Sequence, residues 1–319
     1  MNWLALPQFQ KSLFPNPKRI KDVRRVMSKA CHFCTKGEDT TSKFHVCAKC
    51  KEIPYCSREC QKAHWPRHKI TCVPPTGLID FPKVCQTLMA NDFLLFCFEM
   101  LLVNEFDLVN KPWRPGSEPL QVQIILDVEP CATADLLKLF STKAKIDSRV
   151  IQGMLQVCFV VSKNSSELEF KSDLLSIQNY PIERYAEEFG LGKEPYVSIT
   201  FLRVVDGKTQ IATSAFVVHQ PAIETCRELK KLVVPAPPGS GVEGDSILLP
   251  MSTFACIELI NGLIQHDSSN DWLMRMNMRE RDKQAIKDAA AARPDQLIRL
   301  MVKKKILNRI KVAKTGSYA

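Results

Sequence analysis

A cysteine-rich segment occupies residues 31–72 and reads CHFCTKGEDTTSKFHVCAKCKEIPYCSRECQKAHWPRHKITC. It holds seven of the thirteen cysteines of the 319-residue chain, which fall with one histidine into four pairs: Cys31/Cys34, Cys47/Cys50, Cys56/Cys60 and His68/Cys72. Two or three residues separate the members of each pair, so one turn of chain directs both side chains at a single ion. Eight soft ligands predict two closed tetrahedral Zn²⁺ sites, with no open position for a catalytic water.

Spacing alone does not say which pairs share an ion. The order C-x2-C, C-x2-C, C-x3-C, H-x3-C, with CSRECQKAHWPRHKITC at its end, resembles the MYND-type zinc finger. In that family the pairs interleave as a cross-brace, and the resemblance implies one Zn²⁺ on Cys31, Cys34, Cys56 and Cys60 and a second on Cys47, Cys50, His68 and Cys72. A segment this short has little apolar core, so we expect zinc to supply most of its folding free energy.

His64 lies four residues after Cys60 and is the competing ligand; the family spacing favours His68, with His64 on a helix surface. The run after the N-cap candidate Ser57 is compatible with helix, and Pro66 suits the first turn of a second helix. The resemblance also implies that Gln61 and Trp65 contact a short proline-containing peptide. Packing of Trp65 over the zinc core is the alternative.

The remaining composition favours an intracellular protein. The first 17 residues lack the pattern of a signal peptide, and in a reducing compartment clustered cysteines indicate metal before disulfides. The other six cysteines are scattered singly in mostly apolar surroundings, which is typical of small buried side chains. The most apolar run, Phe93–Val103, contains Glu99 and is too short to cross a membrane. Nucleus and cytoplasm are not distinguished.

Charge divides the chain into three parts. The total is +10, but residues 1–75 carry +10, residues 76–274 carry −9 and residues 275–319 carry +9. Together with the Pro74-Pro75 break this predicts five segments, which are a basic N-terminal segment (1–30), the finger (31–72), a linker (73–79), an α+β domain (80–274) and a basic helical segment (275–319).

In the 80–274 domain, hydrophobic patterning predicts a mixed or antiparallel sheet flanked by helices. We expect one long helix over Val84–Val103, and further helices over Ala222–Leu232 and Pro250–Gln265. The expected strands are Gln121–Val128, Met154–Val161 and a hairpin over Tyr196–Val218 that turns at Asp206-Gly207.

For each basic end of the chain, the sequence leaves two alternative interpretations. Residues 17–25 are typical of an import signal or nucleic-acid arm, or of the solvated face of a short helix, which we favour. From Trp272 to Lys314 the pattern is helical and divided at Pro294. The last helix has an apolar stripe (Leu297, Leu300, Met301, Leu307, Ile310) and a basic face (Lys303, Lys304, Lys305, Arg309, Lys311). We expect the stripe to pack on the acidic body with the charges solvated, rather than to bind nucleic acid or lipid.

The body offers no catalytic motif that we recognise. Gly-rich phosphate loops, G-x-S-x-G and H-E-x-x-H are absent from the sequence, and His219 and His266 have no evident partner. The acidic pairs Asp127/Glu129 and Glu187/Glu188 favour solvated or structural roles. MYND fingers also occur in SET-type lysine methyltransferases, but only 30 residues precede Cys31 and the Asn-His-Ser-Cys run of that family is missing, which disfavours this class.

The sequence therefore predicts a zinc-stabilised cross-brace finger joined to an α+β body with a helical basic C-terminus. Its predicted function is non-enzymatic recruitment of a protein partner through a proline-containing peptide, with transcriptional regulation as one setting. The alternatives are an enzyme with an unrecognised site in 80–274, and nucleic-acid binding through the basic ends.

Overall fold

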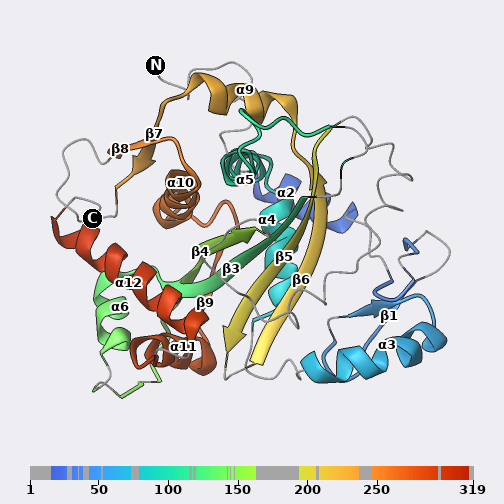
Figure 1. Cartoon of the computed structure of the whole chain (residues 1–319). Coiled ribbons are helices and arrows are strands. Elements are labelled where there is room, and N and C mark those ends of the chain that lie inside the picture. Colours follow the sequence, from blue (N-terminus) through green and yellow to red (C-terminus); the bar gives the residue numbers. More distant parts are fainter. Residues whose placement is uncertain are drawn as a thin grey trace.

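A computed structural model describes most of the chain (Figure 1). The described residues are 16–26, 31–34, 36–38, 43–51, 53–72, 79–114, 117, 120–141, 143, 145–146, 148–162, 194–205, 208–236, 246–293 and 296–315. Within them the finger and the body each have their own hydrophobic core. The body combines helices with a mixed sheet, which confirms the predicted α+β class.

The body is built on a five-stranded sheet with the order β6-β5-β3-β4-β9. Its central strand β3 pairs in parallel with β5, and the other neighbours pair antiparallel. The strands are β3 (Leu120–Pro130), β4 (Gln152–Ser162), β5 (Tyr196–Val205), β6 (Lys208–Val217) and β9 (Arg275–Asn277). The predicted strands and hairpin are therefore confirmed. The turn residues Asp206 and Gly207 lie outside the described residues, but the pairing of Val205 with Lys208 leaves a two-residue connection.

Helices gather at two places around this sheet (Figure 1). One group consists of α5 (Asp92–Glu105), α9 (Gln220–Glu228) and α10 (Thr253–His266), beside the small hairpin β7 (Lys231–Pro235) and β8 (Ser246–Pro250). The other consists of α6 (Thr133–Phe140), α11 (Glu280–Ala290) and α12 (Leu297–Thr315). Glu187 and Glu188 lie outside the described residues.

The single helix expected over Val84–Val103 is wrong. The chain instead forms α4 (Phe81–Met89) and α5, which meet at a bend of 88°. The break falls at Asn91, whose side chain accepts a hydrogen bond from the Leu94 N–H at 3.1 Å and so caps the new helix. No single described helix is long and apolar enough to cross a membrane, and α4 and α5 meet that test only as a bent pair.

Two other boundaries also differ from the prediction. The helix expected over Ala222–Leu232 ends at Glu228, and Leu232 is a buried residue of β7. The pattern taken as helical from Trp272 begins with β9, the edge strand of the sheet, before α11 starts at Glu280. In both places a short strand completes a pairing with distant residues, which local periodicity does not report.

A helix side chain bonds to the backbone of strand β4 beside an irregularity in the sheet. The β3–β4 register shifts between Ile125 and Leu126, and the backbone of Val157 lies at the shift. Asn261 of α10 donates to the Val157 carbonyl and accepts from its N–H, both at 2.8 Å. The buried amide therefore satisfies both backbone polar groups of Val157, which lies past the end of the β4–β9 pairing of Gln152, Gly153 and Met154.

Strand β3 carries two buried carboxylates that join the C-terminal helices to the sheet. Asp127 accepts from Arg203 of β5 at 3.0 Å, and Arg203 also donates to Asp282 of α11 at 2.8 Å. Glu129, with 0% of its surface exposed, accepts from Lys305 at 2.5 Å and from Arg309 at 2.6 Å, both on α12. The structural role expected for Asp127 and Glu129 is thus a buried ion-pair network.

The expectation for the last helix is partly wrong. Helix α12 does pack on the body, and Val302, Ile306 and Ile310 are buried there. However, Arg309 is buried and only 10% of the Lys305 side chain is exposed, so both are ion-pair partners of Glu129 rather than solvated cations. Leu307 of the predicted apolar stripe is 47% exposed. A buried carboxylate requires a cation, so complementary charge, together with buried apolar side chains such as Ile306 and Ile310, defines the packed face.

The N-terminal basic segment also packs against the body. Helix α2 (Pro17–Val26) contacts α4 and buries Ile20. Arg24 donates to Thr87 at 3.0 Å, and Arg19 pairs with Asp92 at 2.5 Å. These contacts favour the short-helix reading of residues 17–25 over a free arm.

Candidate metal centre

The finger consists of two turns, a minimal hairpin and one helix. The hairpin is β1 (His45–Val46) with β2 (Pro54–Tyr55), and the helix α3 (Arg58–Thr71) follows it. Ser57 caps α3 by accepting from the Cys60 N–H at 3.3 Å, as its position predicted. Pro66 lies inside this one continuous helix, so the second helix expected to start there is not formed.

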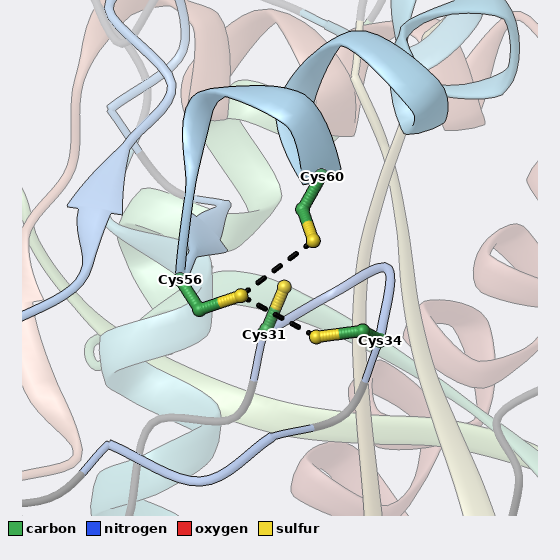
Figure 2. A group of neighbouring side chains, drawn as sticks. All are labelled: Cys31, Cys34, Cys56 and Cys60. Carbon is green, nitrogen blue, oxygen red and sulfur yellow. Dashed lines mark hydrogen bonds between the residues drawn. The ribbon is translucent and has the colours of Figure 1, made fainter.

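The first cluster joins the first turn of the segment to the start of α3. Cys31 and Cys34 come from the turn, and Cys56 and Cys60 flank the helix start, with their sulfurs directed at one point (Figure 2). The Cys34–Cys56 and Cys56–Cys60 sulfur separations are 3.4 and 3.5 Å. All four sulfurs lie within 4.8 Å of one another.

The second cluster joins the other turn to the end of α3. Cys47 and Cys50 flank the turn, and His68 and Cys72 lie on and just after the last turn of the helix. The Cys47–Cys72 sulfur separation is 3.8 Å, and His68 Nε2 lies 3.5 Å from the Cys50 sulfur. All four residues are buried, and the two clusters interleave along the chain.

These separations fit a central zinc ion. Four sulfurs bound at about 2.3 Å in a tetrahedron lie about 3.8 Å apart, and a sulfur and an imidazole nitrogen lie about 3.6 Å apart. A disulfide would bring two sulfurs to about 2.05 Å, whereas all these cysteines are free thiols. The finger thus has one donor set of four cysteines and one of three cysteines and a histidine, consistent with two zinc ions. An ion in each would tie α3 to a different turn.

The thiols differ in acidity in a way that suits metal capture. Burial raises the pKa of Cys31, but N–H groups of Cys34, Cys56 and Phe33 outweigh it and lower the pKa to about 6. In the second cluster, the pKa of Cys47 is also lowered, because neighbouring N–H groups outweigh its burial. Burial and nearby thiolates raise the pKa of Cys72 to about 12. Cys31 and Cys47, one in each cluster, are thus thiols with a lowered pKa, and Zn²⁺ binding would displace the proton of Cys72.

His64 takes a different role from His68. Its Nδ1 lies 2.9 Å from the Tyr55 hydroxyl, and its ring stacks on His68 at 5.8 Å with an interplanar angle of 13°. His64 belongs to neither ligand cluster. The stacked ring of His64 therefore helps to orient the ring of His68. The sequence spacing did not predict this contact.

The two residues proposed for peptide contact sit on the ligand-bearing helix. Trp65 is 40% exposed, and its ring meets His68 edge-on at 5.8 Å. It thus both packs beside the second cluster and presents an aromatic surface to solvent. Gln61, one turn earlier, is half-buried. The helix that carries them contacts β6, the edge strand of the body sheet.

In the body, both histidines have partners that the sequence did not suggest. His219 Nδ1 lies 2.9 Å from the buried Glu99 carboxylate, and the His219 N–H donates to the same group at 3.0 Å. Burial raises the pKa of Glu99, and His219 partly offsets that rise. His266 Nδ1 lies 2.8 Å from the Gly262 carbonyl in its own helix. His219 thus links the start of α9 to α5, and His266 bonds within the last turn of α10.

Comparison with known proteins assigns both parts of the chain. Residues 31–72 match the MYND finger, and residues 76–312 match a domain of unknown function, DUF8205. Among curated relatives, the SET domain and MYND-type zinc finger protein 6 of Schizosaccharomyces pombe is 33% identical over 99 residues, 27% of this chain and 19% of its own. N-lysine methyltransferase SMYD2 of Sus scrofa is 46% identical over 44 residues, 14% of this chain and 10% of its own.

The MYND-type zinc finger protein samB of Emericella nidulans is 39% identical over 57 residues, covering 17% of this chain and 10% of samB. The chain thus spans between a tenth and a fifth of the length of these relatives. No solved structure matches. The resemblance to a MYND finger is confirmed, and the SMYD2 and samB matches are of a length comparable to the finger.

Proposed function

Because this chain belongs to the DUF8205 family and carries a MYND finger ahead of that domain, we propose that it recruits a protein partner by binding a proline-containing peptide on the finger. MYND fingers are protein-interaction modules. Zinc would act structurally, holding α3 in place; the ligands we propose are Cys31, Cys34, Cys56 and Cys60 for one ion, and Cys47, Cys50, His68 and Cys72 for the other. The lysine methyltransferase activity in the name of SMYD2 is said of that protein and is not part of this proposal.

The observation that carries this proposal is the partial exposure of Trp65. A tryptophan that is 40% exposed on a metal-braced helix offers a rigid aromatic surface, and such surfaces hold polyproline II segments because those segments are already ordered. Gln61 lies one helical turn away and has amide groups for the peptide carbonyls. A role in transcription would follow from the identity of the partner.

We propose the finger, residues 31–72, as the binding module and the remainder as its support. The boundary predicted between the 80–274 domain and the 275–319 segment falls within the DUF8205 match. The Glu129 contacts to α12 likewise favour one body that runs from residue 79 to residue 315.

The test measures peptide binding by the full-length protein. Zinc-loaded wild type and Trp65→Ala are compared by selecting from a displayed library of 12-residue peptides with a fixed central Pro-Pro. We expect wild type to enrich a family of sequences that Trp65→Ala does not. Phe33→Ala is the matched control, because Phe33 is a finger aromatic with 49% exposure outside α3. Equal selection by wild type and a folded, zinc-loaded Trp65→Ala would refute the proposal.

A further inference from the structure

A row of exposed cations lies beside the proposed peptide site on α3. Arg58, Lys62 and Lys69 are all exposed. At about 100° per helical residue they point within about 60° of Trp65 and on the same side of it. Gln61 and His68 point to the other side, toward the metal clusters. Trp65 is therefore bordered by the zinc-bearing core on one flank and by the cation row on the other.

Helix α3 has a single acidic side chain that could offset the row. Glu59 is the only acidic residue of α3, and its pKa is lowered first by its own backbone N–H and by the Ser57 hydroxyl, with smaller effects of Lys62 and Arg58. Its carboxylate is thus engaged at the helix start. None of the three cations forms an ion pair with another described residue.

Several cations of the terminal helices α2 and α12 are already paired with acidic residues. Arg19 of α2 pairs with Asp92, and Lys305 and Arg309 of α12 pair with Glu129. The acidic body thus compensates the basic helices at both ends of the described chain. Other exposed cations of the finger lie away from Trp65, whereas the α3 row lies at the edge of the surface proposed to bind a partner.

We infer that the partner peptide carries acidic residues within about three positions of its proline, and that Arg58, Lys62 and Lys69 bind them. This inference rests on the proposed function and names the chemistry of its partner. From residue 58 to residue 69 the row extends about 16 Å along the helix, at about 1.5 Å per residue. A polyproline II segment rises about 3.1 Å per residue, so about five peptide residues span the row. An acidic side chain next to the proline therefore meets at least one cation.

The experiment extends the same selection to charge variants of the full-length, zinc-loaded protein. The test variant is Arg58→Gln/Lys62→Gln/Lys69→Gln. The control is Lys36→Gln/Lys43→Gln/Lys304→Gln, which removes the same charge from exposed positions outside α3. We expect wild type and control to enrich Asp and Glu within three positions of the Pro-Pro pair, and the test variant to lose that enrichment.

The size of the effect is measured as the affinity of one selected acidic peptide for wild type and for the test variant. An exposed ion pair changes affinity by a factor of about 1.5 to 5, so losing three weakens binding by about tenfold. We expect this difference to shrink as salt rises from 50 to about 500 mM, because exposed charges are screened. Replacing the acidic residues of the peptide by Asn and Gln should weaken binding to wild type as much as the triple substitution does.

Three results would overturn the inference. If wild type selects proline peptides without acidic enrichment, the cation row is not used, while the proposed function stands. If the test variant loses zinc, the row serves the metal centres, whose seven thiolates and two ions carry a net charge of −3. If a 20-base-pair DNA duplex binds wild type more tightly than any selected peptide and loses binding in the test variant, the row is a nucleic-acid surface. Loss of selection in Trp65→Ala reports on the proposed function separately.

Discussion

The substitution Arg309→Met tests how α12 is held to the body. Arg309 is 7% exposed, donates to Glu129 at 2.6 Å and also donates to the Pro130 carbonyl at 3.0 Å. Methionine fills similar space but leaves the fully buried Glu129 with Lys305 as its remaining cation. Breaking a buried pair on one side costs about 3–5 kcal/mol, because the other charge stays buried without compensation. We expect the free energy of unfolding to fall by about 3 kcal/mol, the lower end of this range, because Lys305 still neutralises part of the Glu129 charge.

Urea unfolding of the full-length protein, followed by circular dichroism at 222 nm, measures this loss. Lys304→Met is the matched control, because Lys304 is the exposed neighbour of Lys305 on the same helix and should change stability by less than about 0.5 kcal/mol. A triple variant, Glu129→Leu/Lys305→Met/Arg309→Met, should recover most of the loss, since apolar residues replace a buried ion cluster at little cost. Equal effects of Arg309→Met and Lys304→Met would refute the reasoning.

The ion pairs of Glu129 also predict how stability depends on pH. Burial raises the pKa of Glu129, but Lys305 and Arg309 outweigh burial and hold it below its ordinary value of 4.5. A carboxyl group with a lowered folded-state pKa stabilises the protein above its unfolded-state pKa, and this contribution is lost as pH falls through the folded value. The stability difference between wild type and Arg309→Met should therefore be largest near neutral pH and shrink below about pH 4.5.

Two further substitutions test the finger and the sheet. His68→Ala should reduce the zinc count by native mass spectrometry from two ions per chain to one. His64→Ala should keep both ions and lose its contacts with Tyr55 and with the ring of His68; loss of an ion in His64→Ala alone would contradict the ligand assignment. Asn261→Leu should lower the free energy of unfolding by about 2–4 kcal/mol, because the Val157 N–H and carbonyl both lose their buried partner. A change under about 0.5 kcal/mol in the same urea assay would contradict that role of Asn261.

The finger could be predicted from sequence because its determinants are local. The pairs Cys31/Cys34 and Cys56/Cys60 are each set by one turn, and family resemblance supplied the interleaving. What the pattern missed was side-chain contact across the finger, such as that between Tyr55 and His64. No spacing rule reports a hydrogen bond between a hairpin tyrosine and a helix histidine.

The body was predictable as strands and helices but not as a set of contacts. The run around β3 reads as a buried strand, yet the partners of its carboxylates come from far along the chain, with Glu129 and Arg309 separated by 180 residues. The break between α4 and α5 did have a local signal. Asn91-Asp92 is a good helix start, and the apolar residues on both sides obscured it.

X-ray absorption at the zinc edge of the zinc-loaded full-length protein tests the central claim most directly. Seven cysteines and one histidine shared by two ions give an average of 3.5 sulfurs at about 2.3 Å and 0.5 nitrogens at about 2.0–2.1 Å per ion. We expect this first shell together with two zinc ions per chain by metal analysis. A single zinc per chain, or a shell dominated by nitrogen and oxygen, would contradict the interleaved two-zinc finger.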